Sequence, residues 1–365
     1  MIKLFLLLFA AGCISLFAAF IAQQNISLIT LQDEKLSFTP HEFYIADVVD
    51  ERTNRNTVAS LIYKDATQAA SLKQVDLQGG AAASLKKFVS HNLYRDTTLR
   101  PVIVTIKQLD LIESASPNGQ VNGKLTVAFS FGLQLKYRTV HLTDYRGGIR
   151  YIRPGSRPDI AEPTLRHGIE DALAYFNTWM GQYAGSNSVL AKEVKVTFSD
   201  YNEKPEGDTI YYAINRPLTW GDFGEKLGPG RFEAEIFAGI GYTEQAEVAK
   251  GIIHLNIALK VYAPKSDCLV KADGVRDKYT LNHEQRHFDI EKLVGEHFKQ
   301  KISAMHLPVD NFDGPINVEY LETLREATRL QKQYDAETRH GTDQQAQAQW
   351  NEKIDKELEL YSIKK

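Results

Sequence analysis

The chain has 365 residues, of which 43% are hydrophobic and 24% are charged. This is the composition of a globular protein, which excludes a wholly disordered or fibrous chain, and the length suggests two domains. The 43 basic and 46 acidic side chains give a net charge of −3. Because there is no basic excess to attract phosphate, we expect no nucleic-acid partner. The two cysteines, Cys13 and Cys268, are too few for a disulfide framework or a cysteine-rich zinc module.

Residues 1–22 are predicted to be a signal peptide or an N-terminal anchor. Lys3 precedes an uncharged apolar run over 4–22, the order found in secretory signals, and this run is long enough to span a bilayer. Cleavage after Ala22, retention as an anchor and lipidation at Cys13 are the three alternatives. We therefore expect an exported protein, periplasmic or attached to the cell envelope, with secretion as an alternative. Membrane contact is expected only through residues 4–22, if they are retained.

Residues 23–185 are predicted to form an α+β domain of mixed sheet and helices. Runs typical of strands cover 43–49, 102–111 and 124–137, while 81–93 and 163–180 have the apolar spacing of helices. The segment 43–52 resembles the start of small bacterial envelope lipoprotein domains. That short likeness implies a binding or assembly module.

A basic and aromatic stretch follows within this domain. We interpret it as a glycine- and proline-rich loop between a strand and a helix, with solvated arginines. The alternative is contact with an anionic envelope polymer or with lipid headgroups. The stretch comprises Tyr145, Arg146, Arg150, Tyr151, Arg153 and Arg157.

Residues 186–365 are predicted to form a second domain, which begins after the polar stretch 185–188. Strand patterns cover 193–198, 209–214, 232–242 and 251–262, and the chain becomes helical from 281. We expect a small antiparallel sheet, then a hairpin of helices over 281–306 and 316–339. The edge of strand 251–262 is expected to pair with an extended peptide. Cys268 is predicted to be a small apolar residue at a strand end.

The motif His283-Glu284-Gln285-Arg286-His287 carries the clearest chemistry. Two histidines four residues apart lie on one helix face, so both imidazoles can bind one metal ion, for which zinc is the best fit. Glu284 is then the candidate general base that takes a proton from the attacking water. The alternative is a solvent-facing helix start with two uncoupled histidines.

A zinc site needs a third protein ligand. Glu291 and His297 lie about 12 and 21 Å from His283 along the helix axis, which is too far for one ion. A hairpin that turns near residue 311 brings 283 opposite a position close to 339. Within that segment we favour His340, because Gly341 ends the helix pattern and frees it to turn inward.

The same segment offers further candidates. Asp335 and Glu337 are the alternative third ligands, and whichever does not bind metal can orient a ligand histidine. Tyr334 and Arg339 are candidates for stabilising an oxyanion. Their alternative roles are core packing for Tyr334 and a solvated helix end for Arg339.

Three separated motifs resemble the bacterial DUF922 family, which is regarded as a family of secreted zinc-dependent proteases. They are residues 216–223 (RPLTWGDF), 283–289 (HEQRHFD) and 334–341 (YDAETRHG). The resemblance covers the C-terminal half alone and implies a zincin-like helix pair. The family usually has glycine where this chain has Arg286, one of the two variable positions of HExxH.

These observations predict an exported zinc-dependent metallohydrolase, a peptidase that acts on a protein or peptide substrate. An envelope polymer is a further candidate partner, recruited by the first domain. The alternative is a non-catalytic envelope binding or assembly protein in which HExxH is silent or structural.

Overall fold

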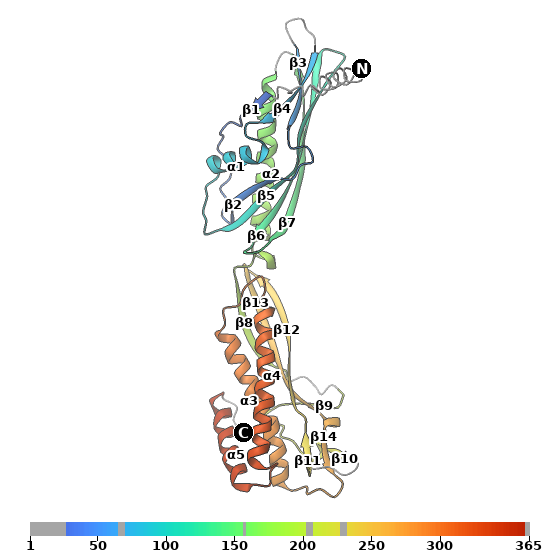
Figure 1. Ribbon diagram of the computed structural model, residues 1–365, viewed down its shortest axis with the longest axis vertical. Helices are drawn as coiled ribbons and strands as arrows, with labels where there is room; N and C mark the ends of the chain where they lie inside the picture. The colour runs from blue at the N-terminus through green and yellow to red at the C-terminus, as the bar shows by residue number, and fades with distance from the viewer. Residues whose placement is uncertain (1–26, 65–69, 156–157, 202–206, 227–231, 362–365) are drawn as a thin grey trace, which may run out of the picture. The chain divides into compact units, whose positions relative to one another are not determined.

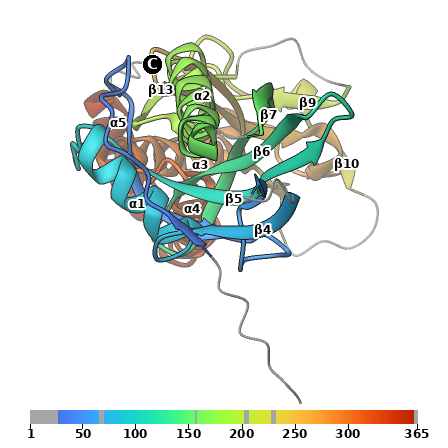
Figure 2. The same ribbon diagram turned by 90° about the horizontal axis from the view of Figure 1, so that it is seen from above.

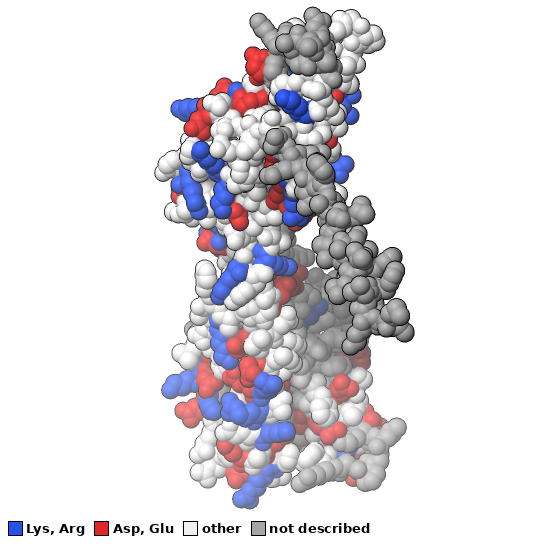
Figure 3. All heavy atoms as spheres, turned by 45° about the horizontal axis from the view of Figure 1, so that its top comes forward, with Lys and Arg blue, Asp and Glu red and all other residues white. Residues whose placement is uncertain are grey.

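The computed structural model describes residues 27–64, 70–155, 158–201, 207–226 and 232–361 (Figures 1 and 2). The predicted signal or anchor, 1–22, lies outside these residues. The chain is of the mixed α+β class, as predicted, and divides into two compact units between Gln182 and Tyr183. No helix in the described part of the chain is long and apolar enough to cross a membrane. On the face shown in Figure 3, basic and acidic side chains are intermingled.

The first unit is built on one sheet of seven strands. Their order is β1-β4-β3-β5-β6-β7, and β2 pairs with β5. The long strands β5, β6 and β7 are antiparallel neighbours, whereas β2 and β5 run parallel. The strands are β1 (Ser27–Ile29), β2 (Phe43–Asp50), β3 (Ala59–Lys64), β4 (Ala70–Leu77), β5 (Arg100–Ala115), β6 (Gln120–Gln134) and β7 (Thr139–Pro154).

Within the described part of this unit two α-helices accompany the sheet, α1 (Ala81–Asn92) and α2 (Ala161–Tyr183). Helix α2 buries its apolar stripe on the sheet, and Phe176 stacks on Phe131 with ring centroids 4.2 Å apart. Gly168 allows the close approach, since a Cβ there would lie 2.6 Å from Leu125 Cδ2. The core of the unit therefore lies between α2 and the sheet.

The basic and aromatic stretch is strand β7, not the predicted loop. Gly123 of the neighbouring strand β6 makes room for an aromatic ring of β7, since a Cβ on Gly123 would fall 2.2 Å from the ring of Tyr151. Arg153 is not solvated either, because it is buried against Glu113. Arg157 lies outside the described residues. In sequence, glycine next to tyrosine resembles a loop, whereas in the sheet it accommodates a neighbouring side chain.

Glu113 is the centre of a buried network in the first unit. Arg153 donates through Nε to Oε1 (2.7 Å) and through Nη2 to Oε2 (2.6 Å). Tyr151 Oη donates to Oε1 (2.5 Å), and the main-chain nitrogen of Ile62 donates to Oε2 (2.7 Å). Burial opposes ionisation of Glu113, but these hydrogen bonds hold its pKa below the usual range.

The described residues of the second unit form two mixed sheets rather than the one antiparallel sheet predicted. One has the order β12-β13-β8 with β9 on β13, and β13 runs parallel to β8. The other has the order β10-β14-β11, with β10 parallel to β14. The strands are β8 (Glu193–Asp200), β9 (Thr209–Tyr211), β10 (Gly224–Lys226), β11 (Ala234–Ile236), β12 (Gly239–Ala249), β13 (Ile252–Pro264) and β14 (Cys268–Lys271).

Two further predictions about these strands are corrected. Strand β13 has partners on both sides, so the expected pairing of a peptide with its edge is wrong. The predicted strand 232–242 is divided between β11 and β12, which lie in different sheets. Cys268 is a buried free thiol at the start of β14, and burial raises its pKa to about 12.

Three helices follow: α3 (Lys278–Ala304), α4 (Asp313–Thr338) and α5 (Gln344–Leu360). They lie side by side in Figure 1. His297 contacts Glu326 and His287 contacts Gln331, so the order of contacts shows that α3 and α4 are antiparallel. Gly295 lets α3 approach β13, because a Cβ there would meet Leu259 Cδ2 at 2.8 Å. Helix α5 is a third, docked helix that the predicted hairpin lacked.

Candidate metal centre

The HExxH residues lie in the second and third turns of α3. Asp277 caps the helix by accepting a hydrogen bond from the Thr280 main-chain nitrogen (2.7 Å). His283 and His287 therefore project from one side of a regular helix, and their ring centroids lie 4.9 Å apart. They are coupled and largely shielded from solvent, unlike the uncoupled, solvent-facing pair of the alternative interpretation.

Asp335 of α4 joins the two histidines. Its Oδ1 lies 3.5 Å from Nε2 of His283 and 3.1 Å from Nε2 of His287. One ligand atom from each of the three residues lies within 4.8 Å of the other two, so together they can hold one metal ion. Although burial opposes ionisation of Asp335, the two imidazoles hold its pKa below the usual range.

The three predicted third ligands have different positions. Asp335 belongs to the cluster. His340 lies beside it, with Nδ1 3.4 Å from Asp335 Oδ1 and its ring stacked on Phe232. Glu337 is occupied elsewhere, accepting hydrogen bonds from Gln333 (2.8 Å) and from Trp350 Nε1 (2.8 Å). The geometry thus favours Asp335 over His340, the residue favoured from sequence.

The end of α4 explains this difference. The helix remains regular through Thr338, so Asp335 stays on the stripe that faces α3. Arg339, His340 and Gly341 then take left-handed conformations, with φ of 50°, 54° and 76°. A Cβ on Gly341 would lie 3.1 Å from Cγ of His283, so this turn packs directly against a candidate ligand.

The two oxyanion candidates also separate. Tyr334 is buried, stacks on His283, and donates its hydroxyl hydrogen to the main-chain oxygen of His283 (3.2 Å). Tyr334 therefore has the core-packing role that was its alternative, and it does not line the cavity. Arg339 does line the cavity and keeps its place as a candidate.

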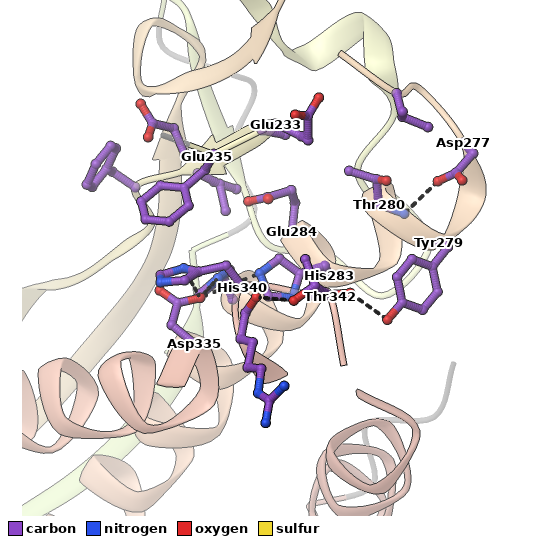
Figure 4. Close-up of a pocket in the computed structure, with 18 residues that line it drawn as sticks. Glu233, Glu235, Asp277, Tyr279, Thr280, His283, Glu284, Asp335, His340 and Thr342 are labelled. Carbon is purple, nitrogen blue, oxygen red and sulfur yellow. Dashed lines mark hydrogen bonds and ion pairs between the residues drawn. The ribbon is translucent and has the colours of Figure 1, made fainter. Parts of the chain in front are cut away.

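A cavity of about 670 Å³ opens beside the cluster (Figure 4). In that view Glu284 lies between His283 and the segment that carries Glu233 and Glu235. Glu284 is 2% exposed, and burial raises its pKa, although His287 and His283 oppose the shift. Among the described residues, neither Oε2 of Glu284 nor Oδ1 of Asp335 has a hydrogen-bond partner.

These orphaned oxygens provide a test of whether a cation fits. A buried carboxylate oxygen without a partner is costly, so native structures rarely keep one unless a ligand, water or ion completes it. Here the residues that carry these two oxygens line one cavity together with His283 and His287. The donor set therefore fits a divalent cation with nitrogen and oxygen ligands.

Sequence reasoning missed two glutamines that hold the histidines. Nδ1 of His283 lies 2.9 Å from Oε1 of Gln347, and Nδ1 of His287 lies 2.5 Å from Oε1 of Gln331. The available signal was spacing, since Gln331 precedes Asp335 by one helical turn. Gln347 lies on α5, beyond the predicted hairpin of helices, and it is 1% exposed.

No family model matches the chain, and no curated protein matches it. Six solved chains match it in structure. One is the crystal structure of protein XCC0632 from Xanthomonas campestris, a DUF330 family protein, with 12% identity and a TM-score of 0.25. The match covers 42% of this chain and 90% of that one. A similarity at this level supports no conclusion about fold or function.

Proposed function

We propose that the second unit is a zincin-like domain and that the protein is a zinc-dependent metallohydrolase, specifically a peptidase. The observation that carries the proposal is the convergence of His283, His287 and Asp335 in a cavity that also contains the unpartnered Oε2 of Glu284. This is also the function that the DUF922 resemblance implies.

The residues present suit a catalytic zinc. His283 and His287 would bind through Nε2 and Asp335 through its carboxylate. Three protein ligands leave a position open for substrate or water. A zinc ion held there supplies Lewis acidity that polarises a carbonyl group and lowers the pKa of water.

Glu284 is the residue that moves the proton. Its Oε2 is buried and unpartnered, so it can take a proton from an attacking water and later pass it to the leaving nitrogen. Burial raises the pKa of this carboxyl above its usual value, which makes it a stronger base. Arg339 lines the same cavity and is the candidate donor to the oxyanion.

Strand β11 supports a peptide as substrate. Within the described ranges its one strand partner is β14, which leaves an edge open along the cavity. The main-chain oxygen of Glu233 accepts from the main-chain nitrogen of Lys271 (2.9 Å), and the main-chain nitrogen of Phe237 donates to the main-chain oxygen of Asp267 (3.1 Å). These alternate positions therefore form their main-chain hydrogen bonds on the side of β14. The main-chain groups of Ala234 and Ile236 therefore face outward, where an extended peptide can add as a strand.

Metal content and peptide cleavage test the proposal together. Purified protein should contain about one zinc per chain, lost in His283→Ala and Asp335→Ala and kept in His340→Ala. A peptide library should be cleaved by the wild type and not by Glu284→Gln, which should keep its zinc. Glu296→Gln, on the same helix but paired with Lys292 and Lys299, is the matched control and should remain active.

Two results would contradict this reading. Absence of zinc in the wild type, even after zinc is offered, would favour the non-catalytic envelope binding or assembly protein. Zinc lost from His340→Ala and kept in Asp335→Ala would return the third ligand to His340.

We also propose that the protein is exported, with residues 1–22 as signal or anchor, and that the first unit recruits a substrate or an envelope partner. Fractionation of cells that express the full chain tests the location. Recovery in the cytoplasm alone would overturn it.

A further inference from the structure

We infer that helix α5 is part of the metal centre. Gln347 of α5 and Gln331 of α4 set the tautomers of the two histidines, and Arg286 holds α5 where Gln347 can do so. The zinc part of this inference rests on the proposed function, whereas the tautomer part is a property of the chain itself.

The orientation of the Gln347 amide follows from its neighbours. Its Nε2 donates to the hydroxyl oxygen of Tyr334 (2.6 Å) and to Oδ1 of Asn351 (3.1 Å). Tyr334 accepts there because its own hydrogen goes to the main-chain oxygen of His283. With both amide hydrogens used, Oε1 must face His283, so that Nδ1 of His283 carries the proton.

The Gln331 amide is fixed in the same way. Its Nε2 donates to the main-chain oxygen of His287 (2.9 Å) and to Oε1 of Glu291 (3.0 Å). Its Oε1 is left to accept from Nδ1 of His287. Nδ1 of each histidine therefore carries a proton, and Nε2 is the ring nitrogen that faces Asp335.

This tautomer is the one that a metal requires. A proton on Nε2 would block the lone pair that binds the ion, so each histidine would first have to exchange its proton. Partners of this kind beyond the ligands typically change metal affinity by about 10- to 100-fold when removed.

Arg286 attaches α5 to α3 within the motif itself. Its guanidinium donates to both carboxylate oxygens of Asp355 (2.5 and 3.0 Å) and to Oδ1 of Asn351 (3.0 Å). It also donates to Asp289, which is fully buried. Such a fork cannot be reproduced by lysine. Asn351 is shared with Gln347, so the position of the amide is coupled to this contact.

Histidine tautomers in metal-free protein provide the first test. Long-range ¹H–¹⁵N spectra of the full chain should show the Nδ1-protonated form at His283 and His287. Gln347→Leu should shift His283 to a mixture of tautomers and leave His287 unchanged, and Gln331→Leu should do the reverse. Gln347→Glu keeps an acceptor and should restore the wild-type form. Gln333→Leu removes a half-buried amide on α4 that bonds to Glu337 and to neither histidine; it is the control and should change neither tautomer.

Zinc affinity, measured by competition with a chelator, provides the second test. Gln347→Leu and Arg286→Lys should bind zinc about 10- to 100-fold more weakly. Gln347→Glu, which keeps the acceptor for Nδ1 of His283, should bind zinc more tightly than Gln347→Leu, and Gln333→Leu should match the wild type. Hydrogen exchange over residues 344–360 should increase in Arg286→Lys, which would report loosened α5. The Gln347→Glu rescue separates loss of the acceptor from general disruption of the fold.

Two results would overturn the inference: an unchanged His283 tautomer in Gln347→Leu, or zinc affinity equal to the wild type in that variant. If the wild type binds no zinc but the tautomers respond as expected, the proposed function fails while the role of the glutamines stands.

Discussion

The two units each bury a glutamate, and the two glutamates have opposite environments. In the first unit both oxygens of Glu113 accept hydrogen bonds, and the pKa of Glu113 is lowered. In the second unit Oε2 of Glu284 has no partner among the described residues, and the pKa of Glu284 is raised. Burial opposes the ionisation of both carboxyl groups. The difference is that hydrogen bonds offset the cost of burial at Glu113, whereas Oε2 of Glu284 receives none within the described part of the chain.

This difference separates structural from chemical carboxylates. A buried charge with a full set of donors stabilises one arrangement of its neighbours. Removing one partner leaves the other as a buried charge without compensation, which lowers the stability of the fold. A buried carboxylate with an open oxygen contributes nothing comparable to stability, and it retains the capacity to take a proton.

The largest expected effect is that of Glu284→Gln on catalysis. Loss of the general base should lower kcat/KM for peptide cleavage by about 10²- to 10⁴-fold. The free energy of unfolding should not fall with it, because no hydrogen bond to Oε2 is lost. Cleavage assays and denaturant unfolding of the same preparation check both halves. A loss of several kcal/mol in stability would show that Glu284 is structural after all.

Glu113→Gln should have the opposite signature. It leaves the buried Arg153 without its charge partner, so the first unit should lose about 3–5 kcal/mol of stability. Hydrogen exchange resolved by peptide reports each unit separately. Exchange should rise in the first unit alone, and cleavage of short peptides should persist.

The matched control for this change is Glu51→Gln. Glu51 pairs with Lys107 at the surface, and both side chains are about half exposed. Pairs of this kind contribute about 0–1 kcal/mol. A Glu113→Gln effect no larger than that of the control would mean that the buried network does not stabilise the first unit.

The sequence predicted the parts of this comparison that depend on local spacing. HExxH on a helix requires only a period of 3.6 residues, and the return of the chain near 335–340 follows from helix lengths. The Glu113 network was not foreseen, because it joins residues 40 apart in the chain whose strands pair through β6. Arg153 in isolation has the pattern of a solvated residue.

The preference of the geometry for Asp335 over His340, and the role of the glutamines, lay beyond sequence reasoning for a related reason. Choosing between Asp335 and His340 requires knowing the residue at which α4 stops, and helix ends are set by capping and packing. From the sequence Gly341 is predicted to free His340 to turn inward, whereas in the structure its left-handed φ and its lack of a side chain accommodate the His283 ring. Gln347 was missed because the docking of α5 depends on contacts with Arg286 that no periodicity reveals.

A smaller effect distinguishes two glycines, one in each unit. Gly341→Ala forces alanine to φ +76° and places Cβ 3.1 Å from His283, so we expect a loss of about 1–3 kcal/mol and weaker metal binding. Gly181→Ala lies in α2 with no atom within 4 Å of the added Cβ, and should gain about 0.5–1 kcal/mol. Thermal unfolding and chelator competition check the pair. Equal effects would mean that the turn after α4 is not constrained by the candidate site.

The smallest effect is in the pH dependence of the first unit. The folded pKa of Glu113 lies below its ordinary value of 4.5, so the unfolded chain takes up the proton first as pH falls. The stabilisation is therefore complete above about pH 4.5 and is lost as pH falls toward the folded pKa, by at most about 1.4 kcal/mol per pH unit for one group.

Denaturant unfolding of wild type and Glu113→Gln between pH 6 and 3, followed by hydrogen exchange in the first unit, isolates this contribution. The difference in unfolding free energy between the two proteins should shrink below pH 4.5, because glutamine does not titrate. Parallel curves would show that the hydrogen bonds to Glu113 do not favour its ionised form, and the contrast with Glu284 would then rest on geometry alone.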